Sequence, residues 1–179
     1  MGVMRITARQ EGRKLITKEV FGQKAIASAQ AQYRIAWAIL GNKADCQDAM
    51  QEALLKAWAA RHKLRDERYF NTWLIRILIN ECKTIRRKQA KHVLMPEAQQ
   101  AVETRQPDTE LRYAIDTLPE KLRLPLVMHY FEGYPVKDIA KALASPTGTV
   151  KNRLLEARKR LRAELEYDKE VWPHEAKFD

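Results

Sequence analysis

The chain has 179 residues, of which 45% are hydrophobic and 31% charged, and its formal net charge is +10. These values are typical of a soluble, folded protein with a core, and the cationic excess favours a polyanionic partner, either nucleic acid or an acidic membrane surface. No segment approaches the roughly 18 apolar residues of a membrane span, and the N-terminal residues lack the apolar stretch of a signal peptide. We therefore expect a cytosolic protein.

Glycine is scarce, at six residues, and the alternation of apolar and polar residues that marks strands is almost absent. The sequence therefore predicts an all-α protein, interrupted where Gly, Pro and Asn gather. Two cysteines, Cys46 and Cys82, are too few for a disulfide framework and have no cluster of His ligands for zinc. We expect both to be reduced thiols in the core.

Residues 45–58 combine an apolar helix face with an acidic one. Asp45 follows a turn and suits an N-cap or first-turn position. On one face apolar residues recur at helical spacing, which predicts that they lie in the core: Cys46, Ala49, Met50, Ala53, Leu54, Ala57 and Trp58. The opposite face places Asp48, Gln51 and Glu52 around a solitary Leu55. This face is either solvated surface with one stray Leu or a small patch that binds a basic protein.

Residues 61–91 reverse the sign, with ten Lys and Arg residues against three acids. Residues 65–71 predict a loop that ends at an N-cap, Asn71, and residues 71–89 predict one long helix. Its expected core side is Phe70, Trp73, Leu74, Ile77, Leu78 and Ile85. Arg76, Asn80, Lys83 and Arg87 recur at helical spacing as a polar stripe able to hold phosphates and present an amide to a base.

Aromatic and cationic residues interleave just before this stripe. Tyr69, Phe70 and Trp73 lie among Arg61, Lys63, Arg65 and Arg68. Such a mixture suits single-stranded nucleic acid, because rings stack on unpaired bases while cations follow the backbone. The alternative is that the aromatics, above all Phe70 and Trp73, are core residues.

Residues 90–109 lose the apolar period and contain Pro96 and Pro107, so we expect a linker. Extended at about 3.3 Å per residue it would reach about 65 Å, close to two turns of B-DNA at about 34 Å each. The expected organisation is therefore an N-terminal segment (1–29), a helical domain (30–89), the linker (90–109), a second helical domain (110–166) and a tail (167–179).

The sequence of the second domain predicts helices over 110–117 and 120–132. Pro125 should kink the second of these helices or mark its first turn, and Gly133 should end it. Residues 136–143, a short turn and a basic helix then follow the helix-turn-helix pattern, in which Val136, Ile139, Ala140 and Leu143 pack on Val150 and Leu154. In such a motif the first turns of the second helix contact bases, and later residues contact phosphates.

The basic helix carries residue types for both kinds of contact. Lys151, Asn152, Leu155 and Glu156 lie away from the packing side and suit guanine, adenine, a thymine methyl and cytosine. Arg153, Arg158 and Lys159 suit phosphates, and Thr149 at the start of the helix is a further DNA-contact candidate. An ordinary solvated amphipathic helix is the alternative.

Together these motifs resemble the extracytoplasmic-function (ECF) sigma factors, the minimal two-domain group of the sigma-70 family. The likeness covers residues 30–165 and rests on YRIAWAILGNKADCQDAMQEALLKAW and FNTWLIRILINECKTIRRK, similar to sigma region 2, and on LPEKLRLPLVMHYFEGYPVKDIAKAL and GTVKNRLLEARKRLR, similar to sigma region 4. Family members often have Gly and then an apolar residue where this chain has Ala144 and Ser145. Residues 1–29 match the usual first helix poorly, and the tail lies outside the pattern.

The resemblance implies a role for each surface. It implies that Asp48, Gln51, Glu52 and Leu55 bind the clamp helices of the polymerase β′ subunit. It implies that the minus-10 element is held as single strands by Arg65, Tyr69, Phe70, Trp73, Arg76, Asn80, Lys83 and Arg87. The second domain would bind the β flap and read the minus-35 element through Thr149, Lys151, Asn152, Arg153, Leu155, Glu156, Arg158 and Lys159. The linker would run through the polymerase toward the RNA exit path.

The resemblance also implies that the protein is not an enzyme, needs no metal or other cofactor, and has an anti-sigma factor as a partner able to hold it at the membrane. Two other classes stay open. A stand-alone helix-turn-helix regulator would bind duplex DNA by itself, but it does not need the acidic face around Leu55 and usually dimerises. A basic membrane-surface or RNA-binding protein would explain the charge but not the acidic helix.

Overall fold

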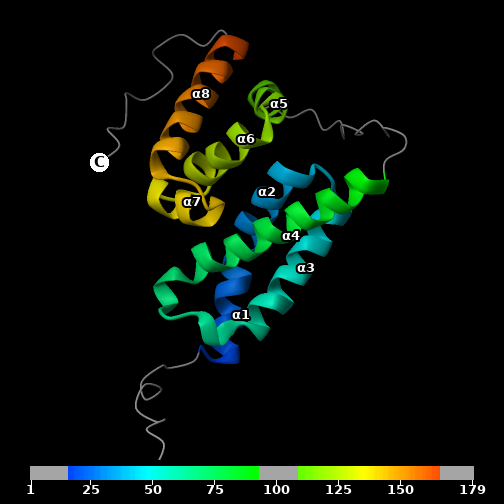
Figure 1. Ribbon diagram of the computed structural model, residues 1–179, viewed down its shortest axis with the longest axis vertical. Coiled ribbons are helices and arrows are strands. Elements are labelled where there is room, and N and C mark those ends of the chain that lie inside the picture. The colour runs from blue at the N-terminus through cyan, green and yellow to red at the C-terminus, as the bar shows by residue number, and fades with distance from the viewer. Residues whose placement is uncertain (1–15, 93–108, 166–179) are drawn as a thin grey trace, which may run out of the picture.

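A computed structural model describes residues 16–92 and 109–165, and every regular element in these two ranges is helical (Figure 1). The first half begins with α1 (Lys18–Ala27), α2 (Ala29–Leu40) and α3 (Lys43–Ala59). Thr17 caps α1, Ser28 separates α1 from α2, and Gly41 ends α2 with a φ of 72°. The Asn42 side chain accepts a 2.9 Å hydrogen bond from the Asp45 amide at the start of α3. Asp45 therefore lies in the first turn, one of its two predicted positions.

Helix α4 (Phe70–His92) is the long helix predicted after the basic loop. Two short 3₁₀ turns, η1 (Arg61–Lys63) and η2 (Glu67–Tyr69), precede it. The Asp66 side chain accepts a 2.9 Å hydrogen bond from the Arg68 amide and caps η2, which runs directly into α4. Asn71 is consequently inside the first turn of α4, and its predicted N-cap role is wrong.

The second half contains α5 (Thr109–Thr117), α6 (Glu120–Leu126), the π turn η3 (Val127–Phe131), α7 (Val136–Leu143) and α8 (Thr147–Leu165). Pro125 lies inside α6, where it has no amide to donate, and the helix widens into η3 directly after it. The predicted kink is thus a π turn. Gly133 then ends the segment with a φ of 67°, as predicted.

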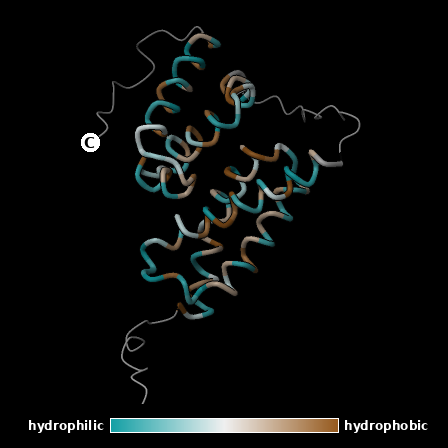
Figure 2. Tube along the Cα trace, viewed as in Figure 1, coloured by the Kyte–Doolittle hydropathy of each residue, from teal (hydrophilic) through white to brown (hydrophobic). Residues whose placement is uncertain are grey.

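The hydrophobic core joins both halves. Helix α4 packs on α3 and α2 and also on α7, while α2 packs on α6 and η3. Figure 1 shows α5–α8 seated against one end of the α2–α4 bundle, and Figure 2 shows apolar positions concentrated on the sides where helices meet. A second cluster, Ile16, Phe21, Ala25, Ala57, Phe70 and Leu74, anchors α1 on α3 and α4.

The expected organisation of the chain can be compared with the described residues at its N-terminal segment. The segment assigned to 1–29 includes α1, which packs through Phe21 and Ala25 into the core and therefore belongs to the first helical half. Most of the predicted linker, residues 93–108, lies outside the described residues, as does the predicted tail. Where the chain is described, the halves are in contact.

Candidate functional site

The exposed face of α3 has the composition that the sequence predicts. Its apolar stripe packs inward, with Cys46, Ala49 and Ala53 fully buried. Leu55 is 58% exposed. Its polar neighbours on the same helix are exposed too, namely Asp48, Gln51 and Glu52. Lys56 forms a 2.5 Å ion pair with Glu81 of α4, so the cation beside Leu55 is turned toward another helix. The result is an acidic surface with one apolar side chain.

The aromatic residues at the start of α4 divide into two environments. Phe70 is only 1% exposed, and its ring packs edge-on against Phe21 at a centroid distance of 5.3 Å. Its ring is therefore unavailable for stacking on a base in this structure, and the core alternative is the correct one for Phe70. Trp73 is half-buried beside it, whereas Tyr69 is 50% exposed and Arg65 is exposed.

The predicted polar stripe of α4 forms a continuous exposed row of Arg76, Asn80, Lys83 and Arg87. Thr84 connects part of it, because its hydroxyl donates to the Asn80 carbonyl at 2.9 Å and accepts from Arg87 Nη2 at 3.2 Å. The row borders an open hollow of about 590 Å³, lined by Asn80, Lys83, Thr84, Arg86, Arg87, Ala90 and Glu120. Glu120 comes from α6 and pairs with Arg86, so an acid of the second half lies among the cations of the first.

Helices α7 and α8 form the predicted helix-turn-helix. Ile139 and Ala140 of α7 pack in the same core as Val150 and Leu154 of α8. The turn between them places Ala144 in the left-handed region, with φ 49° and ψ 44°, and the Ser145 amide donates to the Ala140 carbonyl at 2.9 Å. The departure at Ala144 thus preserves the turn, although a left-handed conformation is strained for any residue with a Cβ.

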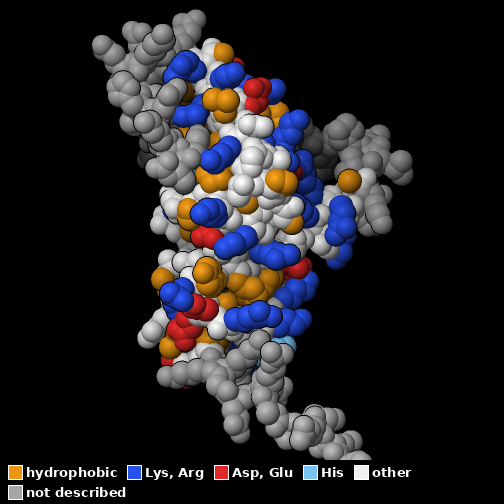
Figure 3. All heavy atoms as spheres, turned by 60° about the vertical axis from the view of Figure 1, so that its left-hand side comes forward, with side chains coloured by type: hydrophobic (Ala, Val, Ile, Leu, Met, Phe, Trp, Pro, Cys, Tyr) orange, Lys and Arg blue, Asp and Glu red, His pale blue; other side chains and the backbone are white. Residues whose placement is uncertain are grey.

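The polar side of α8 carries the predicted DNA-contact residues in different degrees of exposure. Val150, Leu154, Ala157 and Leu161 are buried, which turns the remaining faces outward. The exposed candidates are Asn152, Leu155, Glu156 and Lys159, and the partly buried ones are Thr149, Lys151, Arg153 and Arg158. Glu156 accepts a 2.8 Å bond from Arg160, one turn further along. Figure 3 shows Lys and Arg side chains spread along the face that includes α7 and α8.

Several residues at the contact between the halves were absent from the sequence-based predictions. They are Arg34, Arg86, Glu120, Arg123 and Glu132, each bonded to a group of the other half. The sequence shows that these side chains are charged. Charge by itself does not identify which residues, far apart along the chain, will pair.

Other chemistry is limited within the described ranges. Cys46 and Cys82 are buried and free, as predicted, and burial raises their pKa values to about 11 and about 12. Residues 16–92 and 109–165 contain no group of His, Cys, Asp and Glu side chains able to hold a metal ion. In the same ranges no helix combines the length and hydropathy needed to cross a bilayer.

Sequence profiles match both halves of the chain. The profile of sigma-70 region 2 matches residues 27–92, and that of sigma-70, region 4 matches residues 108–161. The RNA polymerase sigma factor SigV of Bacillus subtilis is 30% identical over 138 residues, which are 74% of this chain and 83% of SigV. The ECF RNA polymerase sigma-E factor of Escherichia coli is 32% identical over 134 residues, 64% of this chain and 70% of that protein.

Solved structures share the fold. The sigma factor RpoE of Bartonella quintana, in complex with the anti-sigma factor NepR, superposes with a TM-score of 0.73 at 24% identity, covering 86% of this chain and all of RpoE. CnrH, in complex with the cytosolic domain of CnrY, superposes with a TM-score of 0.62 at 21% identity, covering 85% of this chain and 91% of CnrH. With both sigma regions matched in order and similar relatives among ECF factors, the chain belongs to the ECF group of the sigma-70 family of RNA polymerase sigma factors, which are initiation factors rather than enzymes.

Proposed function

We propose that this protein binds core RNA polymerase through α3, holds the minus-10 element on the η2–α4 segment and reads the minus-35 element with α8. The observation that carries the proposal is the segregation of charge: an acidic face with an exposed Leu55 on α3, and basic surfaces on α4 and α8. A stand-alone DNA-binding regulator has no use for such an acidic face, because it would repel the phosphates of DNA.

The α3 face supports docking to a basic protein surface. Leu55 supplies an apolar anchor, and the acids around it supply steering and orientation. Interface energies concentrate in a few such anchors, so truncating Leu55 should weaken polymerase binding more than truncating one of its acidic neighbours. Asp48, Gln51 and Glu52 would form the rim.

The η2–α4 surface supports binding of single strands. Tyr69 offers an exposed ring, Asn80 an amide, and Arg65, Arg76, Lys83 and Arg87 offer cations along the backbone path. Trp73, half-buried next to Phe70, would contribute one edge, while Phe70 itself supports the surface from the core. Stacking combined with backbone neutralisation is the chemistry required to hold unpaired bases.

Helix α8 supports duplex readout in the major groove. Lys151, Asn152 and Leu155 carry donors, an amide and an apolar tip near the start of the helix. Glu156 accepts from Arg160 through Oε1, so its other carboxylate oxygen could accept from cytosine while the exposed pair is kept. Thr149, Arg153, Arg158 and Lys159 would hold phosphates on either side.

We also propose an anti-sigma factor as partner and a cytoplasmic location, with that partner able to hold the protein at the membrane. One protein of similar fold was solved with the anti-sigma factor NepR, and another with the cytosolic domain of CnrY. The β flap of polymerase is the further contact proposed for the second half, and residues between the halves would follow the path toward the RNA exit.

The test is run-off transcription with purified core polymerase on a library of templates with randomised minus-35 and minus-10 elements. We expect the wild type to select a two-part motif. Leu55→Ala should lower output from every selected template by about tenfold, as expected for loss of an interface anchor. Lys151→Ala should lower it selectively at one minus-35 position, because a base contact carries sequence information.

Matched controls keep these effects specific. Ile26→Ala removes an apolar side chain that is 79% exposed on α1, outside the α3 face, and should leave output unchanged. Lys121→Ala removes an exposed cation of α6 and should leave the selected motif unchanged. The proposal fails if the wild type opens no template, or if it binds duplex promoter DNA with the same specificity when polymerase is absent.

A further inference from the structure

The α3 docking surface, the surface proposed to bind polymerase, consists of Asp48, Gln51, Glu52 and Leu55. Residues 45–58, which include this surface, contain three acids and a single cation, Lys56. Glu52 precedes Lys56 by four residues, and this spacing and order are the most favourable ones for an ion pair along a helix. The local sequence of α3 therefore favours a Glu52–Lys56 pair, which would neutralise part of the docking surface.

In the structure Lys56 pairs with another helix instead. Its Nζ atom donates to Oε2 of Glu81 in α4 at 2.5 Å. The Glu81 side chain is only 14% exposed, whereas Glu52 is exposed. A carboxylate that is largely withdrawn from water attracts a cation more strongly than a solvated one, because water and salt screen it less. The packing of α4 on α3 therefore decides which carboxylate Lys56 binds.

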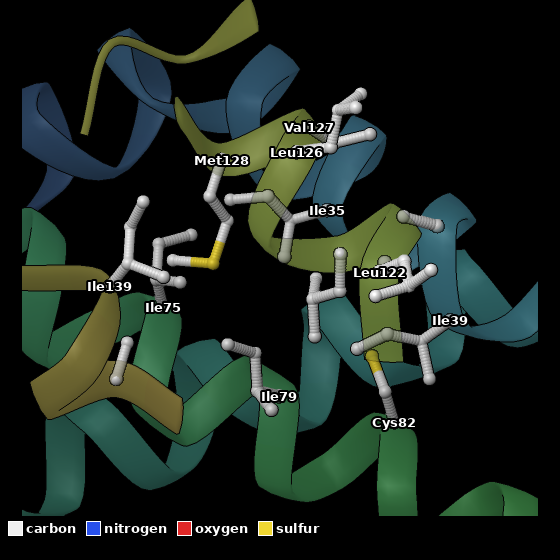
Figure 4. Close-up of a cluster of buried hydrophobic side chains, with 14 of the residues drawn as sticks. Ile35, Ile39, Ile75, Ile79, Cys82, Leu122, Leu126, Val127, Met128 and Ile139 are labelled. Carbon is white, nitrogen blue, oxygen red and sulfur yellow. The ribbon is translucent and has the colours of Figure 1, made fainter. Parts of the chain in front are cut away.

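The direction of Glu81 is fixed by its neighbours along α4. Leu78 and Cys82 are fully buried. Figure 4 shows Cys82 pointing into the core cluster toward Ile39. Rotation of α4 about its axis would expose these apolar side chains to water, at a cost that scales with their area. Glu81 is therefore held at the border with α3, where it can accept from Lys56.

A second contact from α4 involves an acid of α3. The Gln89 amide donates to the Asp45 carboxylate in the first turn of α3, which also accepts from the Asn42 amide. Both donors are uncharged, so Asp45 keeps its negative charge. Helix α4 thus supplies a carboxylate to the cation of residues 45–58 and a neutral amide to one of the acids. Both contacts leave this side of α3 more negative than its own sequence would make it.

We infer that Glu81 is a positioning residue for the α3 docking surface: it holds Lys56 away from Glu52 and so keeps the Glu52 carboxylate available to a basic partner. Within residues 16–92 and 109–165 Glu52 takes part in no ion pair, which is the state this role requires. Glu81 itself does not need to touch the partner. Its importance for docking rests on the proposed function of α3, whereas the choice of Lys56 between two carboxylates does not.

The choice made by Lys56 is tested on the full chain without polymerase. A water-soluble carbodiimide joins an amine to a carboxylate in contact with it, with loss of water, and mass spectrometry of the peptides identifies the two residues. Wild type should give a crosslink between Lys56 and Glu81, and Glu81→Gln should give one between Lys56 and Glu52 instead. The role of Glu81 is refuted if wild type already joins Lys56 to Glu52, or if Glu81→Gln does not.

The consequence for docking is measured as the affinity of fluorescently labelled protein for purified core polymerase at low salt. Glu81→Gln should bind about threefold more weakly than wild type, because Lys56 then neutralises Glu52. The double variant with Lys56→Gln should return to the wild-type affinity, because two amides replace the ion pair and Glu52 is available again. Glu19→Gln, which removes one exposed acid from α1 and changes the net charge equally, should leave the affinity unchanged.

Glu52→Gln separates this role from a merely structural one. In otherwise wild-type protein it should weaken binding about threefold, but in the Glu81→Gln background it should cause no further loss, because that carboxylate is already neutralised. Additive losses, or a Lys56→Gln and Glu81→Gln double variant that stays weak, would refute the role of Glu81. If wild type does not bind core polymerase at all, the proposed function fails, and the crosslinks still show where Lys56 pairs.

Discussion

Helices α4 and α8 are both long, basic and proposed to contact promoter DNA, but the fold makes them unequally available. On α8 the proposed base-contacting residues Asn152 and Leu155 are exposed. On α4 the stripe is exposed but shares its hollow with Glu120, and Lys141 lies 5.2 Å from the ring of the half-exposed Tyr69. The two helices are alike in their basic composition. They differ in accessibility because α4, unlike α8, lies at the contact between the halves.

The difference arises from which half of the molecule supplies the neighbours of each helix. Helix α4 packs on α2 and α3 on one side and on α7 on another, whereas α8 packs on α5, α6 and α7 of its own half. A helix with partners in both halves transmits any movement between them. We therefore expect α4 to report the state of the whole protein and α8 to report its own half.

The largest expected effect tests whether the halves unfold together. Leu78→Ala on α4 and Leu154→Ala on α8 each truncate a fully buried side chain, which should cost about 3 kcal/mol of unfolding free energy. Because the core is continuous, calorimetry should show a single transition, lowered by about 10 °C in each variant. Two transitions, of which each variant moves only its own, would show that the contact between the halves does not couple them.

A smaller effect separates base reading from phosphate binding. Lys151→Ala should cost about 2 kcal/mol of discrimination at one minus-35 base pair, because it removes a donor to a base edge. Lys83→Ala on α4 should instead weaken binding on all templates and lower the salt dependence by about one counterion. Both are measured as affinities of the polymerase complex for promoter variants across a salt series. Equal effects on all sequences from Lys151→Ala would assign α8 to phosphate contacts only.

The local features of this fold could be predicted from sequence because they depend on residues close along the chain. Helical spacing predicted the buried face of α3 and the exposure of Leu55, and Gly133 predicted a stop that needs positive φ. The expected core side of α4 included Leu78 but omitted Ile75 and Ile79. Those two recur with Cys82 at helical spacing and lie in the cluster shared with the second half, so α4 has a second apolar face that the prediction missed.

Interactions between distant residues were out of reach for the same reason. Arg34 and Glu132 lie 98 residues apart, and nothing in the spacing of either helix indicates that they pair. The burial of Phe70 was one of two readings left open, since an aromatic between cations suits both a core and a stacking surface. The site residues on α3, α4 and α8 stay predictions, because their roles depend on partners outside the chain.

The smallest expected effect concerns the turn that orients α8. Ala144 occupies the left-handed region at φ 49°, where a Cβ is strained and glycine is not. Ala144→Gly should therefore raise the unfolding free energy by up to about 1 kcal/mol, the relief of strain exceeding the extra chain entropy of glycine. Ala163→Gly, at an exposed right-handed position of α8, should lower it by about 1 kcal/mol. Urea unfolding measures the free energy of both variants. A gain at Ala144 with a loss at Ala163 would show that the conformation of the turn, not glycine itself, decides the outcome. A loss at both positions would mean that Ala144 is not strained.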